Sequence, residues 1–191
     1  LTYASDTTAA LPGTADLSLG RPGLAATGNA DAGYFGGGSP SQSRMDKITY
    51  SNDTTAYTPG ANLSSSRYFI AATGNSTHGY FGGGIPGLAI MDKTTYSSDT
   101  TAAVPGANLS VGRGYLAATG NLSAGYFGGG YTGSSYISTM DKTTYSSDTT
   151  AAVPGAALSV IRYYLAGASA RANGLPSVGP APSSPAVRFT D

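Results

Sequence analysis

Short apolar segments alternate with clusters of glycine, proline, asparagine, aspartate and serine along almost the whole chain. None of these segments keeps a helical period over more than about ten residues, and short runs bounded by turn residues are typical of β-strands. In the third part of the chain, for example, the pattern predicts four strands, at residues 114–119, 125–129, 140–146 and 150–153. The 28 glycines and 11 prolines supply the turns that many short strands require, so we predict an all-β fold.

One unit that begins with an arginine recurs along the chain. Arg21, Arg67 and Arg113 are 46 residues apart, and Arg162 follows 49 residues after the third. The run MDKTTYSSDTTAAVPGA at 91–107 is repeated letter for letter at 140–156. Four strands in about 46 residues match the size of one blade of a β-propeller.

The order of motifs within the unit resembles the kelch repeat. YFGGG is followed by a strand that ends in tyrosine, then a DT turn, a PG turn and the next arginine. Kelch blades carry a diglycine after an aromatic-rich strand and two spaced aromatic residues further on. The first of these aromatics is present as Tyr50, Tyr96 and Tyr145, whereas the second, usually tryptophan, is absent. The phrases YSNDT, LAATGN and GYFGGG also resemble repeats in predicted structural proteins of marine tailed phages, particularly cyanophages, which implies a virion or extracellular component.

The two ends of the chain carry complementary parts of one unit. Residues 1–3 and 8–11 match a third and a fourth strand, 162–166 match a first strand, and 185–190 are a candidate for the missing second strand. We therefore predict a single domain over residues 1–191, a four-bladed propeller whose terminal strands pair and leave no free edge. The repeat units are about 1–38, 39–84, 85–130 and 131–191, with 167–191 as a divergent closing segment. The alternative is a ring of six to eight blades, the others lying upstream of Leu1, because the chain opens in the middle of the pattern.

Composition and charge exclude several classes of function. The chain has 10 basic and 10 acidic residues and no run of lysine or arginine, whereas nucleic-acid binding favours a basic face. It has no cysteine, which excludes disulfides, thiolate metal sites and cysteine nucleophiles. No apolar stretch approaches the roughly 18 residues of a membrane helix. We expect no cofactor, no nucleic-acid partner and no membrane insertion.

The connection between the second and third strands is the variable part of the unit. It reads SPSQSR at 39–44, IPGLAI at 85–90 and YTGSSYIST at 131–139, while the strands barely change. Propeller strands alternate in direction, so these loops are expected on the same face as the connections between units. Variable loops on a rigid scaffold commonly bind ligands, although drift in a tolerant surface loop is the alternative. The candidate contact residues in these loops are Leu88, Tyr131 and Tyr136.

The four repeated arginines are a second set of candidates. Arg21, Arg67, Arg113 and Arg162 enter the first strand from that face, and guanidinium groups bind carboxylates, sulfates and phosphates bidentately. The alternative is a structural role, in which each pairs with a repeated carboxylate. The candidate carboxylates are Asp46, Asp92 and Asp141.

The sequence gives little support to an enzymatic function. His78 is the only histidine and occurs in one unit, and the aspartate of each SxDT turn is explained by local Asx-turn hydrogen bonds. We expect a non-enzymatic binding or adhesion module, such as a tail-fibre component that contacts a host-surface glycan or protein. The alternatives are an architectural subunit of a filament or virion, and an intracellular kelch-type adaptor.

Overall fold

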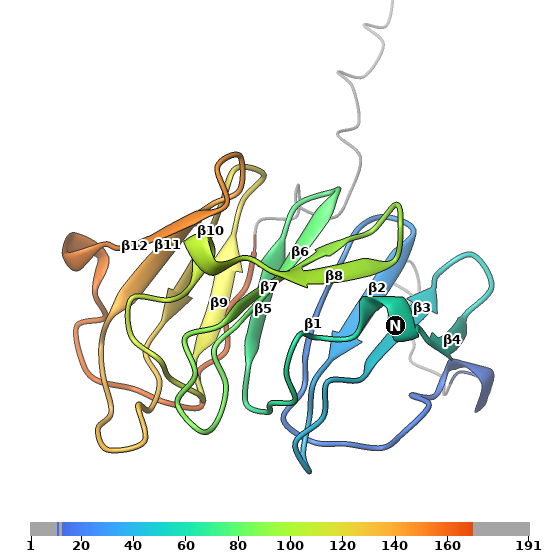
Figure 1. The fold of residues 1–191 in the computed structure, drawn as a ribbon, viewed down its shortest axis with the longest axis horizontal. Coiled ribbons are helices and arrows are strands. Elements are labelled where there is room, and N and C mark those ends of the chain that lie inside the picture. The colour runs from blue at the N-terminus through green and yellow to red at the C-terminus, as the bar shows by residue number, and fades with distance from the viewer. Residues whose placement is uncertain (1–10, 12, 170–191) are drawn as a thin grey trace, which may run out of the picture.

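Three four-stranded antiparallel sheets make up the fold of the computed structural model, which describes residues 11 and 13–169 (Figure 1). The first sheet contains β1 (Ala25–Gly28), β2 (Ala32–Gly36), β3 (Met45–Thr49) and β4 (Thr54–Tyr57). The second contains β5 (Ala71–Gly74), β6 (His78–Gly82), β7 (Met91–Thr95) and β8 (Thr100–Ala103). The third contains β9 (Ala117–Gly120), β10 (Ala124–Gly128), β11 (Met140–Thr144) and β12 (Thr149–Ala152). Each sheet keeps its strands in chain order.

Single turns of 3-10 helix are the only helices in the described part of the chain. They are η1 (Gly13–Ala15), η2 (Pro59–Ala61), η3 (Pro105–Ala107) and η4 (Pro154–Ala156). In η2, η3 and η4 the turn begins at the proline of the PG motif, whose fixed φ suits a helical first turn. The all-β prediction is therefore confirmed.

The four strands predicted in the third repeat are all present, with shifted ends. The first begins at Ala117 rather than 114, because Tyr115 has a φ of 57°, in the left-handed region that a strand residue does not adopt. The third ends at Thr144 because the turn to β12 follows it. The sheets span 25–57, 71–103 and 117–152, so the unit boundaries after 38, 84 and 130 fall between the second and third strands of a sheet.

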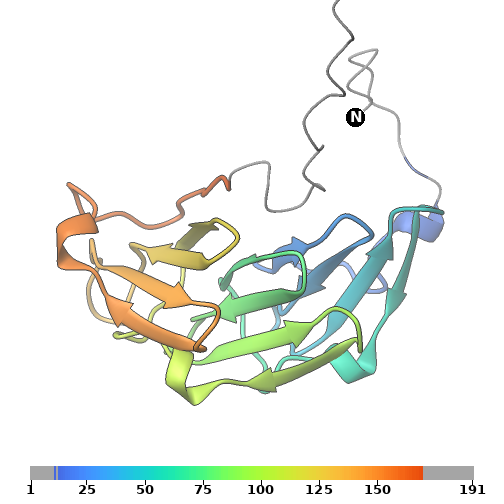
Figure 2. The ribbon, with the colours of Figure 1, turned by 90° about the horizontal axis from the view of Figure 1, so that it is seen from above.

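The sheets are arranged side by side in an arc (Figure 2). Their first strands pack against one another, β1 on β5 and β5 on β9. The buried side chains form two clusters, and each cluster lies between two neighbouring sheets. In the first cluster, Tyr34 and Met45 of one sheet pack with Phe81 and Tyr96 of the next. The core is thus divided between the sheets, as expected for blades of a propeller.

Both aromatic residues of the GYFGGG motif pack between neighbouring sheets. The Tyr34 ring stacks on Tyr96 with 5.0 Å between centroids, so the tyrosine reaches the following blade. Phe81 reaches back to the preceding blade, where a Cβ at Gly36 would lie 3.0 Å from its ring. The glycine of the motif therefore makes room for the phenylalanine of the next sheet.

The ends of the predicted ring lie outside the described residues. This applies to the strands predicted at 1–3 and 8–11, apart from Leu11, and to the closing segment beyond residue 169. The last described residues run beside β9: the Thr119 hydroxyl donates to the carbonyl of Ala168, and the Gly120 N–H donates to Ser169 Oγ over 3.2 Å.

Candidate binding face

The loops between the second and third strands lie at one end of the blades, the lower end in Figure 1. They share this end with the segments that carry the repeated arginines. The Arg67 N–H donates to the carbonyl of Gln42 over 3.0 Å, and Gly114 and Tyr131 exchange two backbone hydrogen bonds of 2.9 and 2.8 Å. The loop at 39–44 is therefore bound to the start of the following unit and the loop at 131–139 to the start of its own unit, and the shared face predicted from strand alternation is confirmed.

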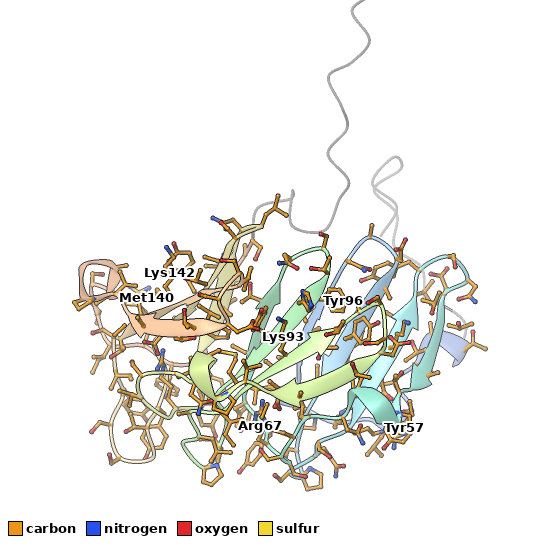
Figure 3. The ribbon with its side chains drawn as sticks, turned by 45° about the horizontal axis from the view of Figure 1, so that its top comes forward. Tyr57, Arg67, Lys93, Tyr96, Met140 and Lys142 are labelled. Atoms are coloured by element: carbon orange, nitrogen blue, oxygen red, sulfur yellow. The ribbon has the colours of Figure 1, made fainter. Side chains whose placement is uncertain are left out.

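Three of the four candidate arginines form buried ion pairs with an aspartate of their own sheet. The Nη1–Oδ2 distances are 2.7 Å for Arg21–Asp46, 2.8 Å for Arg67–Asp92 and 2.9 Å for Arg113–Asp141, and all six side chains are 0% exposed. Arg67 also donates to the carbonyl of Phe81 over 3.0 Å. Figure 3 places Arg67 near the loop end of the molecule.

These three arginines therefore have the structural role, in which each pairs with a repeated carboxylate. A guanidinium that is fully buried and bound to a carboxylate has no surface left for a ligand, so the predicted ring of ligand-binding arginines is not formed here. Arg162 differs, because it is exposed and its side chain has no hydrogen bond or ion pair with any other described residue.

Aromatic side chains lie close together at the end of the sheets that carries these loops, which we call the loop face. Of these residues, only Tyr131 and Tyr136 were predicted from the sequence. Ring centroids are 4.0 Å apart for Phe69–Tyr115, 4.6 Å for Tyr115–Tyr164 and 5.2 Å for Tyr163–Tyr164. They are 4.3 Å apart for Tyr136–Tyr163. We call this group the aromatic cluster; its members are Tyr68, Phe69, Tyr115, Tyr131, Tyr136, Tyr163 and Tyr164.

Three members of the aromatic cluster occupy the same position of successive units, two residues after the arginine. Phe69, Tyr115 and Tyr164 have φ angles of 52°, 57° and 53°, and Gly23 holds this place in the first unit with a φ of 70°. Bulky residues rarely adopt this conformation, and such outliers concentrate at functional sites.

A backbone ladder joins these positions across all four units. The N–H of Phe69 donates to the carbonyl of Gly23 over 2.7 Å, Tyr115 to Phe69 over 2.9 Å, and Tyr164 to Tyr115 over 3.1 Å. The ladder explains why the strained conformation persists, because each step pairs a backbone N–H of one unit with a backbone carbonyl of the unit before it.

A small hollow of about 100 Å³ lies where the four units converge. Its walls are the four ladder residues together with the aliphatic residue that follows each of them, and Ile70 and Leu116 among these are buried. The aliphatic residues are Leu24, Ile70, Leu116 and Leu165. Apart from Gly23, the lining residues have aliphatic or aromatic side chains, and Phe69, Tyr115 and Tyr164 among them belong to the aromatic cluster.

The three contact residues predicted in the loops do not all lie in the aromatic cluster. Tyr131 and Tyr136 lie together, with 5.0 Å between ring centroids, and belong to the aromatic cluster. Leu88 is half-buried, and its carbonyl accepts the Arg113 N–H over 3.1 Å, so it supports the loop and has no place in the cluster. The signal for the missed residues is the aromatic residue within two positions of each later arginine, in RYF, RGY and RYY.

A polar groove of about 490 Å³ lies at the other end of the first two blades. Its lining includes Asp31, Lys47 and His78, and the His78 Nδ1 lies 2.8 Å from the Thr77 hydroxyl. Within the described residues, no three metal-ligating side chains of the His, Cys, Asp and Glu types come together. None of the helices described is long and apolar enough to cross a membrane.

No model of a known protein family matches the chain, and no curated protein matches it.

Proposed function

We propose that the chain is a non-enzymatic binding or adhesion module that contacts a glycan or a protein surface through its loop face. The observation that supports this function is the aromatic cluster. Three of its tyrosines are exposed, Tyr136 by 45%, Tyr163 by 46% and Tyr164 by 67%. Adjacent exposed aromatic rings at one end of a soluble scaffold are typical of recognition surfaces.

Tyrosine suits such a surface for physical reasons. Its ring offers a broad apolar face with few rotatable bonds, and its hydroxyl offers one donor and one acceptor at the rim. The ladder holds the backbone at Phe69, Tyr115 and Tyr164, and stacking restricts the rings of the pairs Phe69–Tyr115 and Tyr136–Tyr163. A preorganised surface loses less conformational freedom when it binds.

We also propose that the described sheets belong to a kelch-like, four-bladed propeller that is closed by the terminal strands. The backbone ladder supports four units around one line, since its three steps connect all four arginine segments. The rings of Phe69 and Tyr164, from the second and fourth units, are 5.9 Å apart, which fits a narrow ring better than a wide one.

The resemblance to phage structural repeats supports a place on a virion or an extracellular appendage, where such a face meets a host surface. A purely architectural subunit is the second candidate. It is supported by the near-identical contacts between blades, such as the stacked pairs Tyr34–Tyr96 and Tyr80–Tyr145 at 5.0 and 4.8 Å.

Binding to a glycan array and to intact host cells tests the first candidate. We expect retention by a defined set of glycans or by one cell-surface protein, and a loss of that retention when Tyr136 and Tyr163 are both replaced by alanine. The matched control is Leu122→Ala, since Leu122 is exposed in the turn between β9 and β10. Retention that survives the double replacement, or that disappears in the control, contradicts the proposed face.

A further inference from the structure

The backbone ladder at the loop face lacks one step. Its three steps join, in chain order, the residues Gly23, Phe69, Tyr115 and Tyr164. Each step runs from an N–H to the carbonyl of the unit before, so a fourth step from the Gly23 N–H to the Tyr164 carbonyl would close the ladder into a ring. Neither of these two groups has a hydrogen bond with any described residue. The junction between the fourth and the first unit therefore has, within the described part of the chain, one donor and one acceptor without partners.

The same junction also lacks one aromatic ring. A Cβ at Gly23 would lie 3.0 Å from the ring of Phe69, so this ring lies on the ladder position of the unit before it. In the same way Tyr115 stacks on Phe69 with 4.0 Å between centroids, and Tyr164 packs on Tyr115 with 4.6 Å. The next position in this order is Gly23, which has no ring to place on Tyr164. Phe69 and Tyr115 are accordingly half-buried, whereas Tyr164 is 67% exposed.

The hollow of about 100 Å³ where the four units converge belongs to this junction, because Gly23 and Tyr164 both line it. Leu24 and Leu165, which follow them in the chain, supply aliphatic walls. Sites that enclose a whole small molecule measure about 300–1,000 Å³. The hollow therefore has room for the end of a ligand only.

A secondary acetamide has the chemistry that these features require. Its C=O and N–H lie on opposite sides of one planar group, so a single acetamide can accept from the Gly23 N–H and donate to the Tyr164 carbonyl. The φ angles of Gly23 and Tyr164, 70° and 53°, lie in the same left-handed range as those of the residues that form the other steps. We therefore expect the two backbone groups to face each other across the junction. The methyl group of the acetamide then enters the hollow beside Leu24 and Leu165.

We infer that the junction between the fourth and the first unit binds the acetamido group of an N-acetylated sugar. This inference rests on the proposed function and names the class of glycan. The sugar ring takes the place of the missing aromatic ring and packs its C–H face on Tyr164, next to the exposed rings of Tyr136 and Tyr163. A peptide with an acetylated lysine carries the same amide, but its side chain brings no ring to cover Tyr164. The sugar is therefore the occupant that the site fits.

Two oligosaccharides test the acetamide without any change to the protein. Chitotetraose and cellotetraose have the same chain of sugar rings, and each ring carries an acetamido group in the first and a hydroxyl in the second. Calorimetric titration of the full chain is expected to show about tenfold tighter binding of chitotetraose, because two hydrogen bonds and a buried methyl group add to the stacking.

The outcomes separate this inference from the proposed function. Equal affinity for the two oligosaccharides, or binding of neither by a protein that a glycan array or host cells retain, overturns the acetamide site and leaves the binding face in place. Retention by no glycan and no host cell overturns both. Tighter binding of a peptide with an acetylated lysine than of chitotetraose overturns the assignment to a sugar.

Hydrogen exchange at the Gly23 amide measures the free donor directly. In the protein without ligand, we expect this amide to be at least about tenfold less protected than the three amides that donate in the ladder, those of Phe69, Tyr115 and Tyr164. Chitotetraose should raise its protection, and cellotetraose should not. A Gly23 amide that is already as protected as the other three shows that the ladder closes on itself, and this result overturns the inference.

Two variants separate the hollow from the stacking ring. Leu24→Phe adds volume to the wall of the hollow and is expected to bring the affinities for the two oligosaccharides to within about twofold of each other. Tyr164→Gly, which suits the positive φ, is expected to weaken both by about tenfold. Leu122→Ala, an exposed change in the turn between β9 and β10, is the matched control and should alter neither affinity. A Leu24→Phe variant that melts like the wild type and still prefers chitotetraose contradicts the site, and the titration and the hydrogen exchange of the unchanged chain decide the question if this variant does not fold.

Discussion

The Arg67 guanidinium and the Asp92 carboxylate are 2.8 Å apart and completely buried, although 25 residues separate them in the chain. The pair ties the segment that enters the second blade to the third strand of that blade. Arg21–Asp46 and Arg113–Asp141 repeat the tie in the other two sheets. The sequence left two roles open for the repeated arginines, ligand binding and pairing with a repeated aspartate, and the structure shows the pairing in each of the three sheets.

Removing one partner of this tie is expected to destabilise the protein strongly. Asp92→Asn leaves the Arg67 charge buried without a counter-charge, and the expected cost is about 3–5 kcal/mol. Chemical denaturation measures this cost as a fall in the free energy of unfolding. The double variant Arg67→Met with Asp92→Leu removes both charges, so it is expected to be more stable than Asp92→Asn. Equal stability of Asp92→Asn and the wild type would show that the pair contributes nothing.

Asp99 and Asp148, whose carboxylates bind lysine and tyrosine side chains of the neighbouring sheet, predict a dependence of stability on pH. Partial burial alone would raise the pKa of Asp99, but hydrogen bonds from Lys47 and Tyr34 outweigh it and lower the pKa; Lys93 and Tyr80 lower that of Asp148 in the same way. A carboxyl whose pKa is lower in the folded state stabilises the fold above its unfolded pKa of about 3.9, and this contribution is lost as pH falls through the folded pKa.

We therefore expect the Tm to fall as the pH is lowered below about 4, and to fall less in the double variant Asp99→Asn with Asp148→Asn. The measurement is a series of melting curves between neutral and acidic pH. Because both carboxylates are partly exposed, added salt at neutral pH should reduce the contribution of their ion pairs with Lys47 and Lys93 to the Tm. An identical acid dependence of the variant and the wild type would assign it to other groups.

The strained tyrosine of the fourth unit predicts an unusual order of variants. Tyr164 has a φ of 53° and is largely exposed, so replacing it removes little buried surface. Glycine adopts this conformation without steric cost, whereas alanine does not. Tyr164→Gly is therefore expected to be more stable than Tyr164→Ala by about 0.5–1 kcal/mol. Thermal unfolding checks the order, and Tyr163, which lacks a positive φ, provides the control in which alanine should be the more stable replacement.

The repeat made much of the fold predictable. Segments bounded by Gly, Pro, Asn and Asp gave all four strands of the third blade, because turn residues act locally and their effect is visible in a short window. Alternation along a strand sends neighbouring side chains to opposite faces, which explains why the tyrosine and the phenylalanine of one motif reach the sheets on its two sides.

The site was harder to predict because it depends on contacts between units. The left-handed conformation of Phe69 and Tyr115 follows from a backbone ladder across repeats, and no propensity of either residue indicates it. Asp99 was expected to bind its own turn, yet the bonds of its carboxylate go to Tyr34 and Lys47 of the neighbouring blade. Sequence spacing identifies equivalent residues, but it does not show which of them face each other.

The last prediction concerns how the aromatic cluster contacts its ligand. If the ring of Tyr136 makes the contact, Tyr136→Phe should retain binding and Tyr136→Ala should weaken it by about 1–3 kcal/mol, a range usual for an interface anchor. If the hydroxyl makes the contact, both replacements should weaken it equally. We expect the ring, because Tyr136 stacks on Tyr163 with 4.3 Å between ring centroids and is 45% exposed.

Two comparisons make that measurement specific to binding. The proximity of Tyr163, and then desolvation, raises the pKa of Tyr136, so its phenol stays neutral and the affinity should not change between pH 6 and 9, on the basis of an ordinary tyrosine pKa of about 10. Tyr131→Ala should reduce the Tm as well as the affinity, since its hydroxyl donates to the Gly133 carbonyl over 2.7 Å and its backbone pairs with Gly114. Tyr136→Ala should leave the Tm within about 1 °C of the wild type, because surface replacements rarely cost more than a few tenths of a kcal/mol. A Tm that falls with Tyr136→Ala while binding persists would make the cluster a structural element and move the recognition surface to another face.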